Sequence, residues 1–185
     1  MSSALLIYAD GSEDLEITAA ADILKRGGVE VIRAALTDNP DKIVTLAHGT
    51  KVICDKTLGE CDELYDVVVI PGGLKGSEAC RDSERLIDIL AEHKRRGRHI
   101  AAICAAPGFV LHTHGFLDGV KATCYPGCND ARIQNLKQDG VVYDERAKIV
   151  TGKGPGYAVE FALKILEILQ GRYIRDRVAA GMLLD

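Results

Sequence analysis

Short apolar runs alternate with amphipathic stretches along this chain, and the alternation predicts the order of its strands and helices. Buried strands are predicted at 4–8, 29–36, 66–70, 99–103, 141–143 and 148–151, with a hairpin within 45–54. Helices are predicted at 12–25, 83–96, 107–113, 156–170 and 174–180, the first with Ser12 as its N-cap. Buried strands that alternate with helices indicate an α/β fold, with a mostly parallel sheet and helices on both faces.

Ligands of such a sheet bind beyond the carboxyl ends of the strands. That rule ranks three loops as candidate sites, namely 9–12, 71–76 and 104–107. The chain has 185 residues and shows no internal repeat, low-complexity tract or linker. We therefore treat residues 1–185 as one domain.

The composition and net charge of the chain argue against several classes of function. Lys and Arg total 23 against 27 Asp and Glu, a net charge of −4, and no basic run is present. Nucleic-acid binding and binding to an anionic membrane are therefore not expected. No apolar run approaches the ~20 residues of a membrane span, and the N-terminus lacks the basic start of a signal peptide, so a cytoplasmic location is expected.

The six cysteines form no CxxC pair. Cys124 and Cys128 are four residues apart, but no second Cys or His pair completes a zinc site with ordinary spacing. We therefore expect no metal. Cytoplasmic thiols stay reduced, so the question is which cysteine is chemically special.

Cys104 stands where the predicted strand 99–103 meets the following helix. This arrangement is that of a nucleophile elbow, whose sharp turn exposes the nucleophile. The neighbouring alanines, Ala105 among them, suit such a turn, and the helix N-terminus would stabilise a thiolate. The amide after the nucleophile is a natural oxyanion donor. The alternative is an ordinary buried core cysteine, and position alone does not decide between the two.

Glu16 favours the first interpretation. Its helical neighbours Ala19, Ala20 and Ile23 form an apolar face, so its side chain is predicted to point inward. A buried carboxyl tends to keep its proton, and a protonated Glu16 could donate a hydrogen bond to a thiolate and then act as a general acid or base. The alternative is a partly exposed glutamate that stabilises the helix dipole.

Two glycine-rich turns also follow predicted strands. Gly72 and Gly73 end the strand 66–70, where glycines allow backbone N–H groups to face a small ligand. An ordinary tight turn is the alternative. The segment 151–156 completes neither G-x-G-x-x-G nor GxxxxGK[ST], so nucleotide binding is not expected, and no cofactor is implied.

None of the five histidines stands out as a catalytic base. His93 and His99 flank the predicted end of a helix and are expected on the surface. His48, in the predicted hairpin, could reach a neighbouring loop or subunit. An amidase would require a histidine beside Cys104, an adjacency that a sequence does not show.

Four motifs together resemble the DJ-1/ThiJ/PfpI superfamily, and more closely its DJ-1-like branch. They are GSEDLE at 11–16, DVVVIPGG at 66–73, AAICAAP at 101–107, and GPG at 154–156 before a long helix. The resemblance covers nearly the whole chain. It implies a flavodoxin-like three-layer α/β sandwich with a cysteine on a nucleophile elbow, usually as a homodimer.

The resemblance also implies roles for individual residues. Cys104 matches the family's reactive cysteine and Glu16 the acid that hydrogen-bonds it. The amides of Gly73 and Ala105 match the oxyanion donors, and Gly72 belongs to the same turn. No cofactor takes part in the family's conversion of glyoxal and methylglyoxal to hydroxy acids.

Two functions follow from the resemblance. The first is a glyoxalase III-type enzyme, or deglycase, acting on small α-oxoaldehydes and on early glycation adducts of proteins or nucleotides, in protection against carbonyl and oxidative stress. The alternative is a redox-sensing or chaperone-like stress protein in which Cys104 is oxidised, as far as the sulfinate, without significant turnover.

Departures from the family pattern mark the remaining candidates. Many DJ-1-like members have a histidine where this chain has Tyr125, so Tyr125 or Cys124 is a candidate third member of the site. Ala105 stands where peptidase-type members have histidine, which disfavours proteolysis. Cys54 aligns with a family cysteine near the dimer interface.

Overall fold

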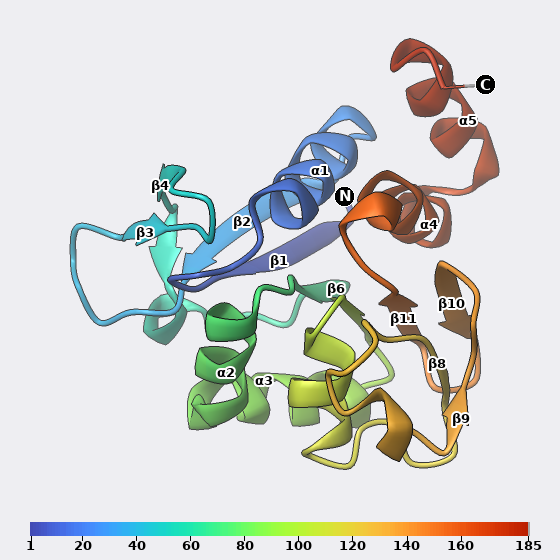
Figure 1. The fold of residues 1–185 in the computed structure, drawn as a ribbon. Helices are drawn as coiled ribbons and strands as arrows, with labels where there is room; N and C mark the ends of the chain where they lie inside the picture. The colour runs from blue at the N-terminus through green and yellow to red at the C-terminus, as the bar shows by residue number, and fades with distance from the viewer. Residues whose placement is uncertain (185) are drawn as a thin grey trace.

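A seven-stranded sheet forms the centre of the computed structural model, which describes residues 1–184 (Figure 1). Its strands are β1 (Ser3–Tyr8), β2 (Glu30–Ala35), β5 (Lys56–Thr57), β6 (Val67–Ile70), β7 (His99–Ile103), β10 (Val141–Asp144) and β11 (Ile149–Gly152). Across the sheet the order is β10-β11-β7-β6-β1-β2-β5. Only the pair of β10 with β11 is antiparallel within this sheet, as the prediction of a mostly parallel sheet requires.

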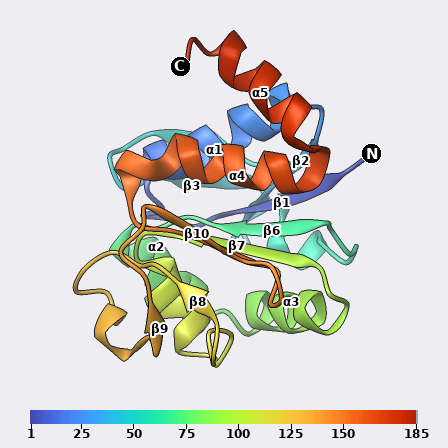
Figure 2. The same ribbon diagram turned by 90° about the vertical axis from the view of Figure 1, so that its right-hand side faces the viewer.

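Helices cover both faces of the sheet. They are α1 (Asp14–Arg26), α2 (Leu74–Asp82), α3 (Glu84–Arg95), α4 (Ala158–Gln170) and α5 (Arg172–Gly181). Figure 2 shows α1, α4 and α5 on one side and α2 and α3 on the other. This arrangement confirms the predicted three-layer α/β fold.

Shorter elements complete the chain. Two small sheets lie outside the main one: β3 (Ile43–Thr45) with β4 (Lys51–Ile53), and β8 (Lys121–Ala122) with β9 (Asn135–Leu136). The first is the predicted hairpin. The short helical turns are η1 (Leu58–Glu60), the π-helical η2 (Pro107–His112), η3 (Asp130–Arg132) and η4 (Pro155–Tyr157).

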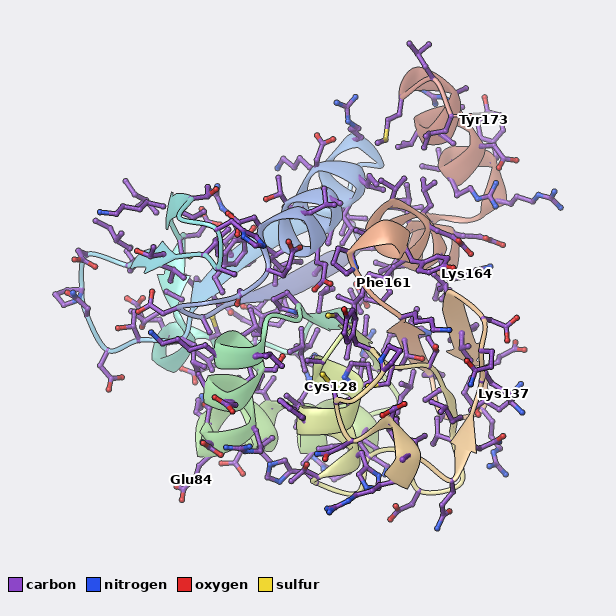
Figure 3. All side chains as sticks on the ribbon, in the orientation of Figure 1. Glu84, Cys128, Lys137, Phe161, Lys164 and Tyr173 are labelled. Atoms are coloured by element: carbon purple, nitrogen blue, oxygen red, sulfur yellow. The ribbon has the colours of Figure 1, made fainter. Side chains whose placement is uncertain are left out.

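Two hydrophobic cores, one on each face of the sheet, hold these layers together. In β1, Leu6 points into the core under α1 and α4, and Leu5 into the core above α2 and α3. Phe161 of α4 is fully buried in the first core (Figure 3). Both faces of a covered parallel sheet are dry, which is why its central strands read as continuous apolar runs rather than as alternating patterns.

The start of α1 differs from the prediction. Ser12 is not the N-cap; it is fully buried and its Oγ accepts a hydrogen bond from the Ala9 amide at 3.0 Å. Glu13 is the N-cap, and its carboxylate accepts from the Glu16 amide at 2.8 Å. A carboxylate caps a helix as a hydroxyl does and also complements the helix dipole.

Two further expectations were wrong. The segment 71–76 was predicted as a loop and no helix was predicted before residue 83, but residues 74–82 form α2. Its buried positions are small or weakly apolar: Gly76, Ser77 and Cys80. Such residues leave little helical signal in a sequence. His93 is not on the surface but on the buried face of α3, with Nδ1 2.8 Å from the Ile89 carbonyl oxygen. Within residues 1–184, no helix is long and apolar enough to cross a membrane.

Candidate active site

The three loops ranked from the sequence meet at the carboxyl edge of the sheet, beyond β1, β6 and β7. The Glu13 amide donates to the Gly72 carbonyl oxygen at 3.1 Å, which joins the first loop to the second. A Cβ atom added to Gly72 would lie 2.4 Å from Cβ of Cys104, which places the second loop against the third. The strand order, with β1, β6 and β7 as neighbours, brings these segments together.

Cys104 occupies the sharp turn that follows β7. Its φ of 64° lies in the left-handed region, which is uncommon for a residue other than glycine and marks stored backbone strain. Hydrogen bonds fix both sides of the residue. Its amide donates to the Gly152 carbonyl oxygen at 2.9 Å, and its carbonyl oxygen accepts from the Tyr125 amide at 2.8 Å. The backbone therefore has the geometry of a nucleophile elbow.

Glu16 points inward from the first turn of α1, as its apolar neighbours predicted. Only 1% of the residue is exposed, and Oε2 accepts from the Gly72 amide at 2.7 Å. Its carboxyl also lies within hydrogen-bonding reach of the Cys104 thiol. Burial raises the pKa of Glu16 to about 7, against the opposing effect of the Gly72 hydrogen bond. Near neutral pH this carboxyl is therefore available both as an acid and as a base.

The protonation of Cys104 is coupled to that of Glu16. Burial raises the pKa of the Cys104 thiol, and so does the neighbouring Glu16 charge, while the Gly73 and Ala105 amides favour the thiolate. When Glu16 is protonated, its charge no longer opposes the thiolate and its proton can be donated to the sulfur. The protonation states of the two side chains are therefore coupled.

The glycines of the turn after β6 have different partners. The Gly73 amide, together with that of Ala105, points at the Cys104 sulfur. Gly73 is the N-cap of α2 and has a φ of 84°, so the turn needs a residue that adopts positive φ. The Gly72 amide binds Glu16 instead, so Gly72 positions the acid.

Tyr125 and Cys124 reach the main chain of Cys104 and not its sulfur. The Cys124 thiol has one hydrogen to donate and lies 3.3 Å from two acceptors, the carbonyl oxygens of Cys104 and Cys128. The Cys104 oxygen also accepts from the Tyr125 amide. The Tyr125 ring lies next to Gly154 and is 46% exposed. Both residues therefore support the elbow, and their role as a third catalytic member stays a prediction.

No histidine belongs to the hydrogen-bond network of Cys104 within residues 1–184, so the site lacks the histidine that an amidase reading required. His99 lies 3.2 Å from the Tyr143 hydroxyl, and His114 lies 2.9 Å from the Arg81 carbonyl oxygen. His48 is linked to the site only through Glu13. Its Nε2 lies 3.6 Å from the Glu13 carboxylate, which in turn accepts from the Glu16 amide.

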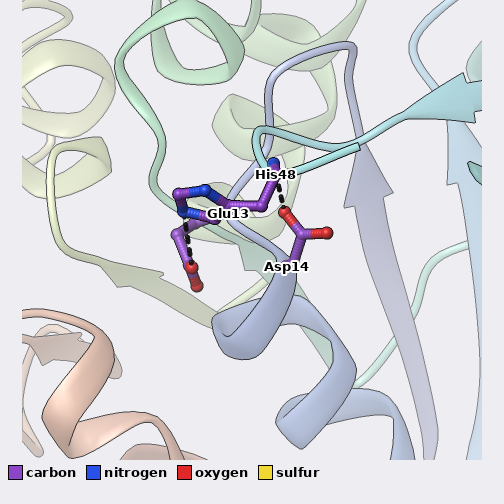
Figure 4. Close-up of side chains that lie close together, drawn as sticks. All are labelled: Glu13, Asp14 and His48. Atoms are coloured by element: carbon purple, nitrogen blue, oxygen red, sulfur yellow. Dashed lines mark hydrogen bonds and ion pairs between the residues drawn. The ribbon is translucent and has the colours of Figure 1, made fainter. Parts of the chain in front are cut away.

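His48, Glu13 and Asp14 form the group within residues 1–184 that offers ligand atoms to a metal ion (Figure 4). Their side-chain ligand atoms lie within 4.8 Å of one another. Two of the carboxylate oxygens already accept backbone hydrogen bonds, since Glu13 accepts from Glu16 and Asp14 from the His48 amide at 2.8 Å. The geometry shows a cap on α1 that ties the β3–β4 turn to the site. Glu13 was not predicted to cap α1; its position three residues before Glu16 is the signal that could have identified the cap.

Replacing Gly72 by alanine should destabilise the fold. The added Cβ would lie 2.4 Å from Cys104 Cβ and 2.7 Å from Glu16 Oε2, so both side chains would have to move. Forced rearrangement of this kind costs about 1–3 kcal/mol. Urea unfolding measures the loss. Gly156→Ala is the matched control, because a Cβ there meets nothing within 4 Å. Equal unfolding free energies for the two variants would contradict the close packing.

The raised pKa of Glu16 predicts how stability depends on pH. Its folded value is about 7 against an ordinary value of 4.5, so between these values the folded protein holds a proton that the unfolded chain has released. The free energy of unfolding should therefore fall as pH rises through this window, by up to about 3 kcal/mol. Glu16→Gln removes this contribution.

Urea unfolding of both proteins at pH 4.5, 5.5, 7 and 8 tests the linkage. The Glu16→Gln variant should gain stability relative to wild type as pH rises, and the difference should level off above pH 7. A difference that does not change with pH would show that Glu16 has an ordinary pKa in the folded protein.

Comparison with known proteins agrees with this geometry. Residues 2–168 match the model of the DJ-1/PfpI family. The chain is 39% identical to protein dj-1beta of Drosophila melanogaster over 184 residues, which span 98% of this chain and 97% of the relative. It is 33% identical to glutathione-independent glyoxalase DJR-1.2 of Caenorhabditis elegans over 174 residues, 92% and 89% of the two chains.

A solved structure described as Toxoplasma gondii DJ-1, oxidized, superposes with a TM-score of 0.92 at 39% identity. The match covers 100% of this chain and 99% of the other. The fold, the motif order and the sequence identity therefore agree. The chain belongs to the DJ-1/PfpI family, in its DJ-1-like branch.

Proposed function

We propose that this protein is a cofactor-independent glyoxalase that converts glyoxal and methylglyoxal to hydroxy acids, with Cys104 as nucleophile and Glu16 as the proton carrier. The observation that carries the proposal is the pairing of Cys104 with Glu16. Cys104 lies in a turn with a strained backbone, and the Glu16 carboxyl beside it is fully buried and has a pKa of about 7. The C. elegans relative named glutathione-independent glyoxalase supports the same reaction. Early glycation adducts, which carry related carbonyl chemistry, are the second substrate class we propose.

The reaction begins when the Cys104 thiolate attacks the aldehyde carbon. The carbonyl oxygen takes the Glu16 proton, and a hemithioacetal forms. The amides of Gly73 and Ala105 are directed at the Cys104 sulfur. In the proposed reaction they also donate to the substrate oxygen as negative charge develops on it. The nucleophile and the acid are thus held together before substrate arrives.

Glu16, now a carboxylate, then removes the hydrogen from the hemithioacetal carbon. The resulting enediolate is protonated at the neighbouring carbon by Glu16, which leaves a thioester of the hydroxy acid on Cys104. Water hydrolyses the thioester and restores the thiol. The sum is methylglyoxal plus water giving lactic acid, with no external oxidant or reductant, because one carbon is oxidised and its neighbour reduced.

Proton NMR of methylglyoxal with the purified protein, in D₂O and without added thiol or cofactor, tests this function. We expect lactate to appear at a rate proportional to enzyme concentration. Hydrogen rather than deuterium at the lactate C2 position would indicate transfer by a shielded Glu16. Absence of lactate above the buffer rate would overturn the proposal.

A redox or chaperone-like role of the same cysteine is the alternative, favoured by the Toxoplasma relative whose structure is described as oxidized. Selective addition of two oxygen atoms to Cys104 by mild peroxide, in a protein without aldehyde turnover, would support it. Oxidation spread over all six cysteines would count against it.

A homodimer is the partner that the family resemblance implies, and we propose a contact surface for it. Ile43 and Ile53 face each other across the β3–β4 hairpin and are 44% and 68% exposed. Exposed branched side chains paired in this way offer an apolar surface to a second copy. Cys54 directly follows Ile53 in the chain, and its place near the interface stays a prediction.

A further inference from the structure

Cys124 and Cys128 lie on either side of the turn that supports the main chain of Cys104. The Cys124 sulfur is 3.3 Å from the Cys104 carbonyl oxygen and 3.3 Å from the Cys128 carbonyl oxygen. The Cys128 amide closes the turn by donating to the Tyr125 carbonyl oxygen at 3.1 Å. The Cys124 side chain therefore lies in direct contact with the main chain of Cys128.

The packing selects this pair over any pair with Cys104. The Cys124 and Cys128 side chains belong to the core above α2 and α3, whereas that of Cys104 belongs to the core under α1 and α4. Figure 3 shows Cys128 on the α2 side of the sheet. Gly108 of η2 presses against both cysteines, since a Cβ there would meet the Cys128 carbonyl oxygen and lie 3.1 Å from the Cys124 sulfur. The backbone of the elbow thus separates Cys104 from the other two thiols.

We propose that Cys124 and Cys128 form a redox-active dithiol whose oxidation to a disulfide withdraws the Cys124 hydrogen bond from the Cys104 carbonyl oxygen and so weakens the elbow. The oxidant is a hydroperoxide or another two-electron thiol oxidant. With a hydroperoxide, the Cys128 thiol is first oxidised to a sulfenic acid with release of water or alcohol. The Cys124 thiol then displaces water from that sulfur, forming the S–S bond.

The surroundings of Cys124 and Cys128 determine how an oxidant reaches the two thiols and how fast they react. Both thiols are buried, but Tyr125, Pro126 and Gly127 between them are exposed, so opening of this surface turn admits a small oxidant. Burial raises the pKa of Cys124 to about 12, which keeps its thiol protonated and makes the pair slow to react. The disulfide should therefore form under sustained oxidation rather than after a brief pulse.

Oxidation of this pair should leave the backbone of Cys104 less firmly fixed. Its left-handed backbone is supported on the carbonyl side by the Tyr125 amide and the Cys124 thiol. A disulfide sulfur has no proton to donate, so one of these two supports is lost. Loss of a hydrogen bond of ordinary strength should slow alkylation of Cys104 about threefold to tenfold.

The chain allows a direct test, because trypsin separates the cysteines cleanly. Cleavage after Arg98, Lys121 and Arg132 places Cys104 alone on peptide 99–121 and both Cys124 and Cys128 on peptide 122–132. The folded protein is treated with diamide, desalted and pulsed with iodoacetamide before digestion. We expect peptide 122–132 to lose two hydrogens and to resist alkylation until it is reduced, while peptide 99–121 is alkylated more slowly.

Cys128→Ser is the matched variant, since it prevents the disulfide and keeps the Cys124 thiol on Cys104. Its Cys104 should be alkylated at the untreated wild-type rate with and without diamide. Three results would each overturn the proposal: no disulfide within peptide 122–132, a disulfide that links peptides 99–121 and 122–132, or equal slowing of Cys104 alkylation in Cys128→Ser. The readout is alkylation, so the test stands whether or not aldehydes are the substrates.

Discussion

Cys104→Ser should reduce methylglyoxal consumption by at least about 10³-fold, because a hydroxyl at this position is a far weaker nucleophile than the thiolate that the elbow holds. Serine is close to cysteine in size, and the backbone hydrogen bonds of residue 104, to Gly152 and from Tyr125, do not involve its side chain. The variant should therefore keep the fold, including the positive φ. Lactate formation by NMR, with circular dichroism as the check on folding, measures the effect.

Cys61→Ser is the matched control for this experiment. Cys61 is also buried, and its thiol donates to the Thr57 carbonyl oxygen at 3.4 Å, a bond that a serine hydroxyl can also make. We expect this variant to retain wild-type turnover. If Cys104→Ser kept more than a tenth of the wild-type rate, the nucleophile would have to be sought elsewhere in the chain.

Glu16→Gln should lower turnover by about 10²–10⁴-fold, the usual contribution of one positioned acid–base group. Glutamine has the same shape, and its carbonyl oxygen can still accept from the Gly72 amide, so the site stays assembled. It carries no proton between the substrate carbons, however. The loss should therefore fall on kcat, with hemithioacetal formation less affected.

Asp22→Asn controls for the loss of a carboxylate from the same helix. Asp22 is exposed and pairs with Arg26 at 2.8 Å, so this change should leave turnover unaltered. Alkylation of Cys104 by iodoacetamide should persist in Glu16→Gln, which would separate loss of proton transfer from loss of the nucleophile. Full methylglyoxal turnover in the Glu16→Gln variant would remove Glu16 from the mechanism.

Sequence periodicity was sufficient for most of the fold. Continuous apolar runs predicted the strands of a sheet covered on both faces, and the helical spacing of Ala19, Ala20 and Ile23 predicted that Glu16 points inward. Local patterns carry such information because burial alternates with the period of each element. Helix α2 was not predicted, because its buried face is made of Gly76, Ser77 and Cys80, which contribute little to a hydrophobic pattern.

The candidate site was predictable only in part. The strand–cysteine–helix junction at Cys104 is a local feature and was identified from the sequence. The hydrogen-bond partner of Glu16 could not be predicted in this way, because Glu16 contacts Gly72, which lies 56 residues further along the chain. That contact distinguishes Gly72, which holds the acid, from Gly73, whose amide is directed at the sulfur.

By itself, then, the sequence determined the α/β fold, the elbow at Cys104 and the inward direction of Glu16, all of which depend on residues within a few turns of one another. The tertiary structure decided what depends on the order of strands across the sheet. It brought Glu16 under Gly72, where burial raises the pKa of its carboxyl, and it placed the Cys124 thiol behind the elbow on the opposite face from the Cys104 sulfur. Of the six cysteines, the fold thus places Cys104 at the proposed reaction centre and Cys124 against its backbone.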